Sequence, residues 1–403
     1  MNNGVAVPDA SPGAMPLFII HYSSKTLPMT YFIREWTRDN LKGDRQIWWI
    51  VLFLSILSVL VVYSATGTLA YQKMSGNTEA YLFKHGALVV LGLVCMFVAH
   101  RINYIHYARL AKFGLWLSVP LLVWAYFKGT NLNDASRWIT IPIINQTFQP
   151  SDLAKLALIS NLAAMLAKRQ RVAYEPQVLV NMIGWIGVIC ALIIISNTST
   201  ALLLGLTCFL LMYIGRVPRS YLAGMVIFCI VVGGFALVLG QRYETVLGRL
   251  SRFQDTEKID YQVEQSYIAL ANGGITGQGP GNSHQRNFLP HPYSDFIFAI
   301  IVEEYGLLGG VSVLAAYLWL LMRGMRAIRS STRPFGGLLS AGLTFSIVIQ
   351  AMINMAVAVG LVPVTGLPLP LLSMGGTSLL FTGAAIGIVI GVSRDEADES
   401  RLR

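Results

Sequence analysis

The chain has 403 residues, of which 54% are hydrophobic and 12% are charged, and its formal net charge is +10. Soluble globular proteins carry about 25% charged residues, so the composition excludes an ordinary soluble domain and indicates a protein surrounded largely by lipid. The Lys and Arg residues occupy short gaps between apolar runs and do not cluster with aromatic residues. This spacing argues against nucleic acid as a partner and is typical of membrane topology signals.

Three parts follow one another along the chain. Residues 1–46 mix Pro, Gly, Ser and charged residues, and we expect a partly disordered cytoplasmic segment there. Residues 47–392 hold the apolar runs and are predicted to form the membrane domain, and residues 393–403 a cytoplasmic tail. We expect no separate soluble domain, because no polar stretch is long enough to bury a core of its own.

Ten apolar runs can cross a bilayer, since a hydrocarbon core of about 30 Å requires about 20 apolar residues in a helix. The runs lie near residues 47–65, 82–98, 110–127, 151–167, 180–196, 198–215, 219–239, 296–322, 337–361 and 375–392. The sequence therefore predicts an all-α polytopic membrane protein with about ten transmembrane helices.

Basic residues gather in the gaps after the second, fourth, sixth and eighth runs and in the C-terminal tail. Cytoplasmic loops carry such an excess of Lys and Arg. We therefore expect a multi-pass protein of the cytoplasmic (inner) membrane with both termini in the cytoplasm. The intervening gaps, which include residues 128–150, 240–295 and 362–374, then face outward.

The predicted outer loop at residues 240–295, between the seventh and eighth runs, is the longest gap. Loops beyond about 15 residues are usually functional or disordered, and the aromatic, Gly and Pro residues here favour a folded loop. Its glycines allow positive φ and close approach to a ligand, or they only shape turns. No Gly-Lys-Ser/Thr closes the stretch, so it is not a P-loop. The candidate binding residues are Gln265, Ser266, Gly277, Gly279, Asn282, Ser283 and His291.

Asp295 lies where this loop enters the eighth run. A carboxylate at an apolar boundary is partly desolvated, which raises its pKa toward the range of a general base. The alternative is a helix-start carboxylate that accepts from free backbone N–H groups. Deeper in the run, Glu303 lies about 80° from Asp295 around a helix and Glu304 lies opposite. Only Glu303 can therefore readily share a cavity with Asp295, and a structural ion pair is the alternative for either acid.

A second candidate site surrounds the fourth run. Asp152 and Lys155 are i,i+3 neighbours and can pair on one face of a helix that starts at Pro150. In the structural interpretation, Asp152 caps the helix and Lys155 is its ion-pair partner. In the functional interpretation, the pair holds the Lys155 cation ready to bind an anionic head group. Arg137, in the preceding outer loop, adds another cation.

A third candidate region lies before the last run, at residues 363–378. Its three prolines interrupt an apolar stretch, and irregular backbone at membrane depth is tolerated only where it is buried or lines a cavity. The candidate binding residues here are Ser373, Gly375, Gly376 and Thr377.

Five motifs together resemble one known family, the SEDS proteins of the FtsW/RodA group, over residues 45–395. They are SRWI at 136–139, QPSDLAKL at 149–156, GQGPGNS at 277–283, LPHPYSDFIFAIIVEEYG at 289–306 and PVTGLPLPLLSMGGTS at 363–378. Within that group, the GNS sequence at 281–283 followed by Gln285 resembles the division-type FtsW branch, and its combination with the RNF run at 286–288 resembles FtsW of the Bacteroidetes lineage. The PVTG sequence at 363–366 leans toward the elongation-type RodA branch.

The resemblance implies an inverting peptidoglycan glycosyltransferase that polymerises lipid II at the outer face of the membrane, in septal synthesis during cell division. It implies that Asp295 is the central catalytic residue, as a base or as a ligand of a divalent cation (Mg or Mn), with no organic cofactor. Lys155 matches the family's lysine, whereas Asp152 stands where the family usually has Glu.

The partners implied by the resemblance are lipid II, a class B penicillin-binding protein transpeptidase and divisome membrane proteins. Three alternatives remain: a lipid II flippase, an elongation-type polymerase, or a scaffold that only recruits the transpeptidase. A flippase predicts cavity-lining charges that reach the cytoplasmic side. A scaffold predicts that Asp295 is dispensable for polymer formation.

Overall fold

Helices dominate the protein, as the apolar runs predict. The computed structural model describes residues 40–67, 78–132, 135–141, 146–170, 175–239, 243–254, 260–331 and 333–401. The prediction for the N-terminal segment falls almost entirely on residues 1–39, outside the described residues. From Lys42 onward the chain forms one unit, and the last helix runs continuously across the predicted boundary at residue 392.

Each of the ten predicted runs overlaps one helix. In chain order these helices are α2 (Arg45–Ala65), α4 (Thr78–Arg101), α5 (Ile105–Lys128), α6 (Pro150–Ala167), α7 (Pro176–Ile194), α8 (Thr198–Ile214), α9 (Arg219–Leu239), α12 (Ile297–Ser330), α13 (Pro334–Ala358) and α14 (Ser378–Arg401). Among the described residues, eight helices are long and apolar enough to cross a membrane. Of the ten helices named above, α6 and α8 do not meet both conditions. The all-α polytopic fold is confirmed, and the exact number of ten spans stays a prediction.

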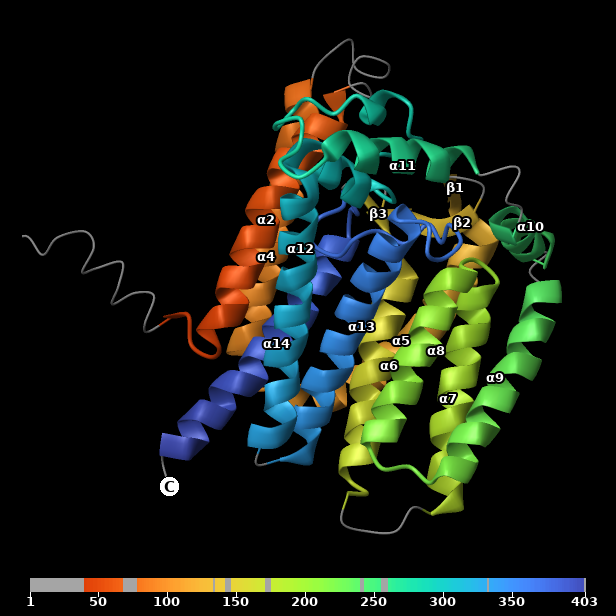
Figure 1. Ribbon diagram of the computed structural model, residues 1–403. Helices are drawn as coiled ribbons and strands as arrows, with labels where there is room; N and C mark the ends of the chain where they lie inside the picture. The colour runs from red at the N-terminus through yellow and green to blue at the C-terminus, as the bar shows by residue number, and fades with distance from the viewer. Residues whose placement is uncertain are drawn as a thin grey trace, which may run out of the picture. The chain divides into compact units, whose positions relative to one another are not determined.

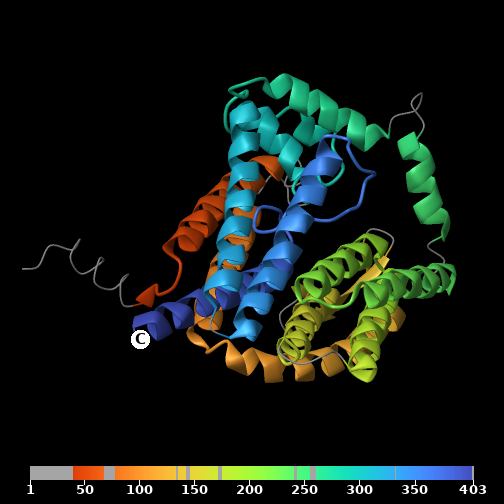
Figure 2. The same ribbon diagram turned by 60° about the horizontal axis from the view of Figure 1, so that its bottom comes forward.

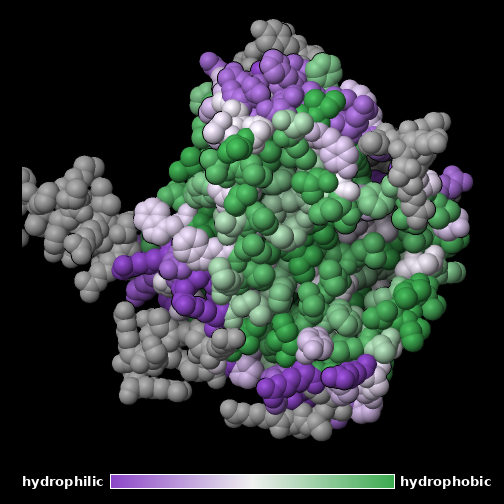
Figure 3. All heavy atoms as spheres, in the orientation of Figure 1, coloured by the Kyte–Doolittle hydropathy of each residue, from purple (hydrophilic) through white to green (hydrophobic). Residues whose placement is uncertain are grey.

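The side of the bundle is strongly apolar. Figure 3 shows a hydrophobic band around the helices, with hydrophilic residues at both ends. Large side chains in this band are widely exposed, for example Phe83 at 74%, Phe127 at 76% and Phe235 at 67%. Exposed apolar area on this scale is unfavourable in water but not in lipid, so the band identifies the membrane-facing surface.

The start of α2 and the second half of α14 meet at one end of the bundle, here called the tail end. Asp44 N donates to Ser393 Oγ at 2.9 Å, and Asp44 also pairs with Arg323 of α12 at 2.5 Å. At the opposite end, here called the loop end, lie α10 (Tyr243–Gln254), α11 (Tyr261–Gly273) and the short η1 helix (Gln285–Asn287) (Figures 1 and 2).

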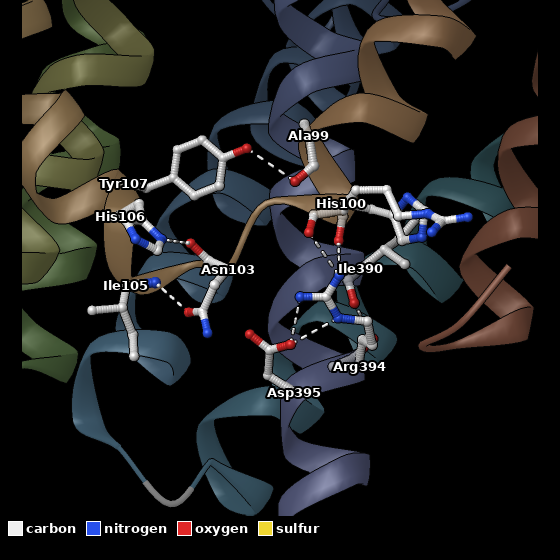
Figure 4. A network of polar contacts seen from close by, with 11 residues as sticks. Ala99, His100, Asn103, Ile105, His106, Tyr107, Ile390, Arg394 and Asp395 are labelled. Carbon is white, nitrogen blue, oxygen red and sulfur yellow. Dashed lines mark hydrogen bonds and ion pairs between the residues drawn. The ribbon is translucent and has the colours of Figure 1, made fainter. Parts of the chain in front are cut away.

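The C-terminal end of α4 is capped by side chains from two other helices at the tail end (Figure 4). Arg394 of α14 donates to the carbonyls of His100 at 2.6 Å and Arg101 at 3.1 Å. Tyr107 of α5 donates to Ala99 O at 2.9 Å. These donors satisfy carbonyls that the helix itself leaves free, and the Arg394 cation is favourable at a helix C-terminus.

Glycines allow α4 and α14 to approach closely. Gly383, Gly387 and Gly391 repeat at every fourth residue of α14, the small-residue spacing typical of helix contacts in membranes. A Cβ atom at Gly383 would lie 2.2 Å from Gly92 O, and one at Gly387 would lie 2.3 Å from Met96 O. Any larger residue at these two positions would push the helices apart.

A small antiparallel sheet connects α5 to α6 at the loop end. Its strands are β1 (Thr130–Leu132), β2 (Ala135–Ile141) and β3 (Gln146–Phe148), in the order β1-β2-β3. The apolar periodicity of the long runs did not predict these strands, because each is short and alternates only weakly. The sheet places β3 directly before the start of α6.

Gly306 interrupts α12. Its φ of 70° and ψ of −169° are not helical, so the helix consists of a first part that ends at Tyr305 and a second part that begins at Leu307. A break within a membrane helix leaves backbone groups without their normal i→i−4 partners. These groups require partners from another part of the chain.

Residues 274–279 of the loop, here called the strap, supply those partners. Leu307 N donates to Gly274 O at 2.9 Å and Leu308 N to Ile275 O at 3.3 Å. The two carbonyls that these amides would use in a continuous helix instead accept from the strap, Glu303 O from Gln278 N and Glu304 O from Gly279 N, each at 2.9 Å. The strap therefore replaces one turn of α12 hydrogen bonding and fixes the loop to the helix.

Glu303 holds the loop and Glu304 contacts α2, and within the described residues neither acid forms an ion pair within 4 Å. Glu303 is fully buried and accepts from Ser283 Oγ and from the amides of His284 at 3.1 Å and Gln285 at 3.3 Å. Glu304 accepts from Ser64 Oγ of α2. In the described residues neither acid is hydrogen-bonded to Asp295, so the shared cavity that the sequence allowed is not formed through such a contact.

Candidate active site

Asp295 lies two residues before α12, at the loop end. Ser294 Oγ donates to Asp295 Oδ1 at 2.9 Å, and Asn354 Nδ2 of α13 donates to the Asp295 carbonyl at 2.8 Å. The residue is partly exposed, unlike the buried Phe296 and Ile297 that follow it. Its backbone is thus fixed by α13 while its carboxylate stays accessible from the loop end.

The irregular segment 359–377, which joins α13 to α14, passes beside this carboxylate. Asn354 Nδ2 also donates to Leu367 O at 2.7 Å, so one amide holds both the segment and Asp295. Gly366 has a φ of 67°, and a Cβ atom there would lie 3.7 Å from Asp295 Oδ2. A side chain at Gly366 would therefore occupy the space next to the carboxylate.

Ser373 ties the same segment to the residues before Asp295. Its hydroxyl donates to Ser294 O at 2.6 Å and accepts from Leu369 N at 2.7 Å, and Met374 N donates to Tyr293 O at 2.9 Å. Burial, and to a lesser degree the nearby Tyr81 and Asp295 groups, raise the pKa of Tyr293 above its usual value of 10.0. The phenol next to Asp295 is therefore neutral at physiological pH.

Asp152 and Lys155 form the ion pair that their spacing predicts. Lys155 Nζ lies 2.9 Å from Asp152 Oδ1, and the side chains are 15% and 4% exposed respectively. Asp152 Oδ2 is buried without a hydrogen-bond partner among the described residues. Lys155 Nζ also donates to Gln350 Oε1 of α13 at 3.4 Å. The third N–H of the ammonium group is available to another acceptor.

Two amides of α13 connect the lysine to the aspartate. Gln350 Nε2 donates to Pro368 O at 2.9 Å, one residue from the Leu367 carbonyl that Asn354 binds. Gln350 and Asn354 are i,i+4 neighbours and so lie on the same face of α13. Sequence reasoning did not single them out, although two amides inside an apolar run are a signal of a polar interior site.

A small cavity of about 40 Å³ opens beside Lys155 between α6, α13 and α14. Its polar lining comprises Asp152, Lys155, Ser346, Gln350, Ser378 and Thr382. The rest is apolar, with Ile159, Leu343, Ile347 and Ala385 among the lining residues. Asp295 is not part of this lining and is linked to it through the α13 amides. The cavity combines a cation with an apolar wall, which suits a ligand that has an anionic group and a lipid chain.

Most candidate residues of the long loop have structural contacts. Ser266 donates to Ala358 O at 2.7 Å and fixes α11 to the end of α13. Gly277 and Gly279 belong to the strap, and Asn282 Nδ2 donates to Gln278 O at 3.0 Å. Ser283 binds Glu303. Their substrate-binding role stays a prediction, since these contacts account for the residue types without a ligand.

Three further candidates, Gly375, Gly376 and Thr377, lie directly before α14. Thr377 accepts from Gln149 N at 3.4 Å and donates to Thr147 O at 3.3 Å, so it joins the last helix to the sheet. Its neighbours Gly375 and Gly376 belong to the same turn before α14, and a Cβ atom at Gly376 would lie 3.9 Å from Thr147 Oγ1.

His291 and Gln265 lie in the long loop. His291 has a φ of 56° and its Nδ1 lies 3.1 Å from Tyr293 OH. It lies three residues before Ser294 and four before Asp295. Gln265 is half-buried on α11. Arg137 belongs to β2, and its side chain lies outside the described part of the structure.

The described residues include no group of three or more His, Cys, Asp or Glu side chains that could hold a metal ion. The four cysteines are free, as expected for small buried or half-buried side chains. A divalent cation at Asp295 would therefore need further oxygen ligands from water or a substrate.

Comparison with known protein families gives one match. Residues 44–398 match the family of FtsW, RodA and SpoVE proteins, described as a cell cycle protein family. The chain is similar to a probable peptidoglycan glycosyltransferase FtsW of Geobacter metallireducens, with 33% identity over 364 residues, which are 88% of this chain and 96% of the relative. It is also similar to stage V sporulation protein E of Bacillus subtilis, with 31% identity over 361 residues, 86% of this chain and 95% of that protein.

Solved structures show the same fold. One similar chain comes from a study of how a peptidoglycan synthase complex coordinates polymerization and crosslinking, with 26% identity, a TM-score of 0.66, and coverage of 88% of this chain and 98% of that one. Another is the rod shape determining protein RodA of Thermus thermophilus, with 23% identity, a TM-score of 0.63, and coverage of 88% and 97%. The likeness to RodA at this identity concerns the fold alone.

Proposed function

This chain belongs to the family of FtsW, RodA and SpoVE proteins, and on that premise we propose that it is a peptidoglycan glycosyltransferase that polymerises lipid II into glycan strands. The observation that carries the proposal is the hydrogen-bonded connection between Asp295 and Lys155 through Asn354 and Gln350 of α13. It fixes the backbone of Asp295 and the ammonium group of Lys155 to the same face of α13, and a cavity with an apolar wall lies beside Lys155.

Asp295 is the proposed general base. In the reaction, the 4-hydroxyl of an acceptor sugar attacks the anomeric carbon of a lipid-linked donor, and the bond from that carbon to the lipid pyrophosphate breaks. The base removes the hydroxyl proton. Support comes from the fixed backbone of Asp295, its accessible carboxylate and the space that Gly366 leaves beside Oδ2. A single displacement of this kind inverts the anomeric configuration.

Lys155 is the proposed partner of the leaving pyrophosphate. Negative charge develops on that group as the bond breaks, and a preorganised cation stabilises it more strongly where water is excluded. The Lys155 ammonium has one N–H beyond its bonds to Asp152 and Gln350. The apolar residues beside this small cavity are the proposed surface along which the lipid chain lies. Arg137 is proposed as a second cation.

A divalent cation at Asp295 is a further proposal. Mg²⁺ is commonly bound by one or two carboxylates together with substrate phosphates and water, and Asp295 supplies one carboxylate. Such an ion would contribute electrostatic stabilisation of the pyrophosphate. Titration of Mg²⁺ and Mn²⁺ against a chelator in the polymerisation assay tests it, and unchanged rates in the chelator would exclude the ion.

We propose that the protein lies in the cytoplasmic (inner) membrane, with the loop end facing outward and the tail end facing the cytoplasm. Basic residues support this orientation, because the tail end carries Arg101, Arg323 and Arg394 and cytoplasmic ends of membrane proteins are rich in Lys and Arg. The reaction centre then lies at the outer face, where lipid-linked precursors are polymerised. Cysteine labelling of the two ends with an impermeant reagent tests the orientation.

A class B penicillin-binding protein transpeptidase is the proposed partner, with divisome membrane proteins, and septal synthesis is the proposed role. The likeness to a chain from a peptidoglycan synthase complex supports the partnership, and the FtsW names of several relatives support the division role over the elongation role. Depletion of the protein tests the role, because a division enzyme leaves filaments and an elongation enzyme leaves rounded cells.

The decisive experiment measures glycan chains formed from lipid II by the purified protein with its transpeptidase, whose own polymerising ability is excluded beforehand. We expect Asp295→Asn to abolish chain formation, because the amide cannot accept the hydroxyl proton. Glu264→Gln is the matched control, since Glu264 is an exposed acid on α11 and its loss leaves the site intact.

Equal chain formation by wild type and Asp295→Asn would contradict the catalytic assignment, and the absence of chains with both proteins would favour a scaffold. Transfer of lipid II between leaflets without polymerisation would favour a flippase. The described charged candidates lie where helices start, Asp295 before α12 and Asp152 and Lys155 in the first two turns of α6 after the loop-end sheet, which supports the polymerase over a transporter.

A further inference from the structure

A second groove lies at the loop end, outside the cavity beside Lys155. It has a volume of about 280 Å³ and lies between α10, the first half of α11 and the segment 360–364 after α13. Apolar and aromatic residues form most of its described lining, together with three charged residues. The residues used below are Arg249, Arg252, Phe253, Asp260, Tyr267 and Val364.

The α10 helix places this groove at the level of lipid head groups. Its apolar residues recur every three or four positions and lie on one face. These residues and their exposures are Tyr243 55%, Leu247 45%, Leu250 45% and Phe253 44%. In Figure 1, α10 is seen nearly end-on while α9 runs lengthwise, so α10 crosses the direction of the membrane helices. A helix with this pattern and orientation lies in the membrane interface, with its apolar face toward the acyl chains.

The charges of the groove favour an anion. Arg249 and Arg252 are i,i+3 neighbours on α10, away from its apolar face. Arg252 pairs with Asp260 at 3.5 Å and remains 58% exposed, so the guanidinium keeps N–H groups directed to solvent. Among the described residues of its lining, the charged ones are these two arginines and Asp260. Guanidinium groups bind phosphate with two parallel hydrogen bonds.

The groove is also close to the proposed catalytic centre. Val364 lines the groove, and Gly366, two residues later, lies beside Asp295 Oδ2. Consecutive Cα atoms are 3.80 Å apart, so Val364 and Gly366 are separated by at most about 7.6 Å. A head group in this groove would therefore lie on the other side of one short chain segment from the Asp295 carboxylate.

We propose that this groove binds the phosphate of a lipid head group, with Arg249 and Arg252 as its ligands and Phe253 and Tyr267 as its apolar wall. Two lipids carry that chemistry at the outer face. One is an anionic phospholipid of the bilayer, and the other is the pyrophosphate-linked lipid II. The second source rests on the proposed function, whereas the first does not.

The test uses the full chain in nanodiscs of zwitterionic lipid. Dissociation constants are measured by native mass spectrometry for two probes, dioleoylphosphatidylglycerol and lipid II, with the wild type and the double variant Arg249→Gln/Arg252→Gln. Lys128→Gln is the matched control, because Lys128 is an exposed cation at the loop end of α5, outside the groove. A charge-assisted hydrogen bond contributes enough free energy that we expect about tenfold weaker binding of at least one probe.

Weaker binding of lipid II alone assigns the groove to the substrate, and weaker binding of the phospholipid alone assigns it to a structural lipid. Dissociation constants within twofold of the Lys128→Gln values for both probes would overturn the proposal. Arg252→Lys, which keeps the charge but loses the paired hydrogen bonds, is expected to bind with intermediate strength. If the wild type forms no glycan chains, the proposed function fails, but both binding measurements still decide the groove.

Discussion

The strap in the break of α12 predicts that Gly277 cannot be replaced. Gly277 has a φ of 84°, and a Cβ atom there would lie 2.2 Å from Glu304 O and 2.6 Å from Gly306 N. Real Cβ atoms essentially never approach closer than 3.0 Å, so Gly277→Ala requires the strap to move by about 0.8 Å. That displacement breaks the neighbouring hydrogen bonds from Gln278 and Gly279 to α12.

The destabilisation can be worked out from these contacts. The left-handed conformation costs an alanine about 1 kcal/mol, and two lost backbone hydrogen bonds cost about 1 kcal/mol each, so Gly277→Ala should lose about 3 kcal/mol. Gly281 is the matched control, because it has a φ of 81° but nothing lies within 4 Å of its Cβ position. Gly281→Ala should therefore lose only about 1 kcal/mol.

Thermal unfolding in detergent, followed by tryptophan fluorescence, measures the difference. For a chain of this length the melting temperature shifts by about 1 °C per kcal/mol, so we expect a fall of about 3 °C for Gly277→Ala and about 1 °C for Gly281→Ala. We also expect slower glycan synthesis with Gly277→Ala, because the strap joins the loop to α12 just after Asp295. Equal shifts for the two variants would refute the argument that the strap supports the helix break.

Three other predictions concern the site and the helix contacts. Lys155→Met leaves Asp152 buried and unpaired, so this variant should lose about 3 kcal/mol of folding free energy. Adding Asp152→Asn should restore stability but not activity. Melting-temperature changes of the two single variants that simply add in the double variant would contradict this coupling. Because the pKa of Tyr293 is raised in the folded state, its stabilising effect is complete below pH 10 and is lost as the pH rises through the folded value. Stability should thus fall less steeply above pH 10 in Tyr293→Phe than in wild type, as measured by denaturation from pH 8 to 11. Gly387→Ala should destabilise the α4–α14 contact. Gly86→Ala is the control, because there is open space at its Cβ position, and it should be neutral or slightly stabilising. Equal melting temperatures of the two variants would argue against close packing of α4 and α14.

Composition and apolar runs were sufficient to predict the membrane class and the positions of the long helices. The reason is that a bilayer demands about 20 apolar residues per crossing, which is a local property of the sequence. The spacing of Asp152 and Lys155 likewise predicted their ion pair, since i,i+3 neighbours meet on any helix. The small β-sheet and the amides Gln350 and Asn354 were not predicted, because their structural role depends on contacts with segments distant in the sequence.

The sequence by itself determined that this protein is a helical membrane protein with family motifs at its loop end, because chain-local patterns encode span length and motif identity. Only the tertiary structure decided how the candidates are used. Glu303, which is near Asp295 in sequence, binds the loop instead, and Lys155, which is 140 positions away, is connected to Asp295 through α13. Such assignments require the packing of segments distant in the chain, and a one-dimensional pattern does not specify which carbonyl or amide will lie opposite a given side chain.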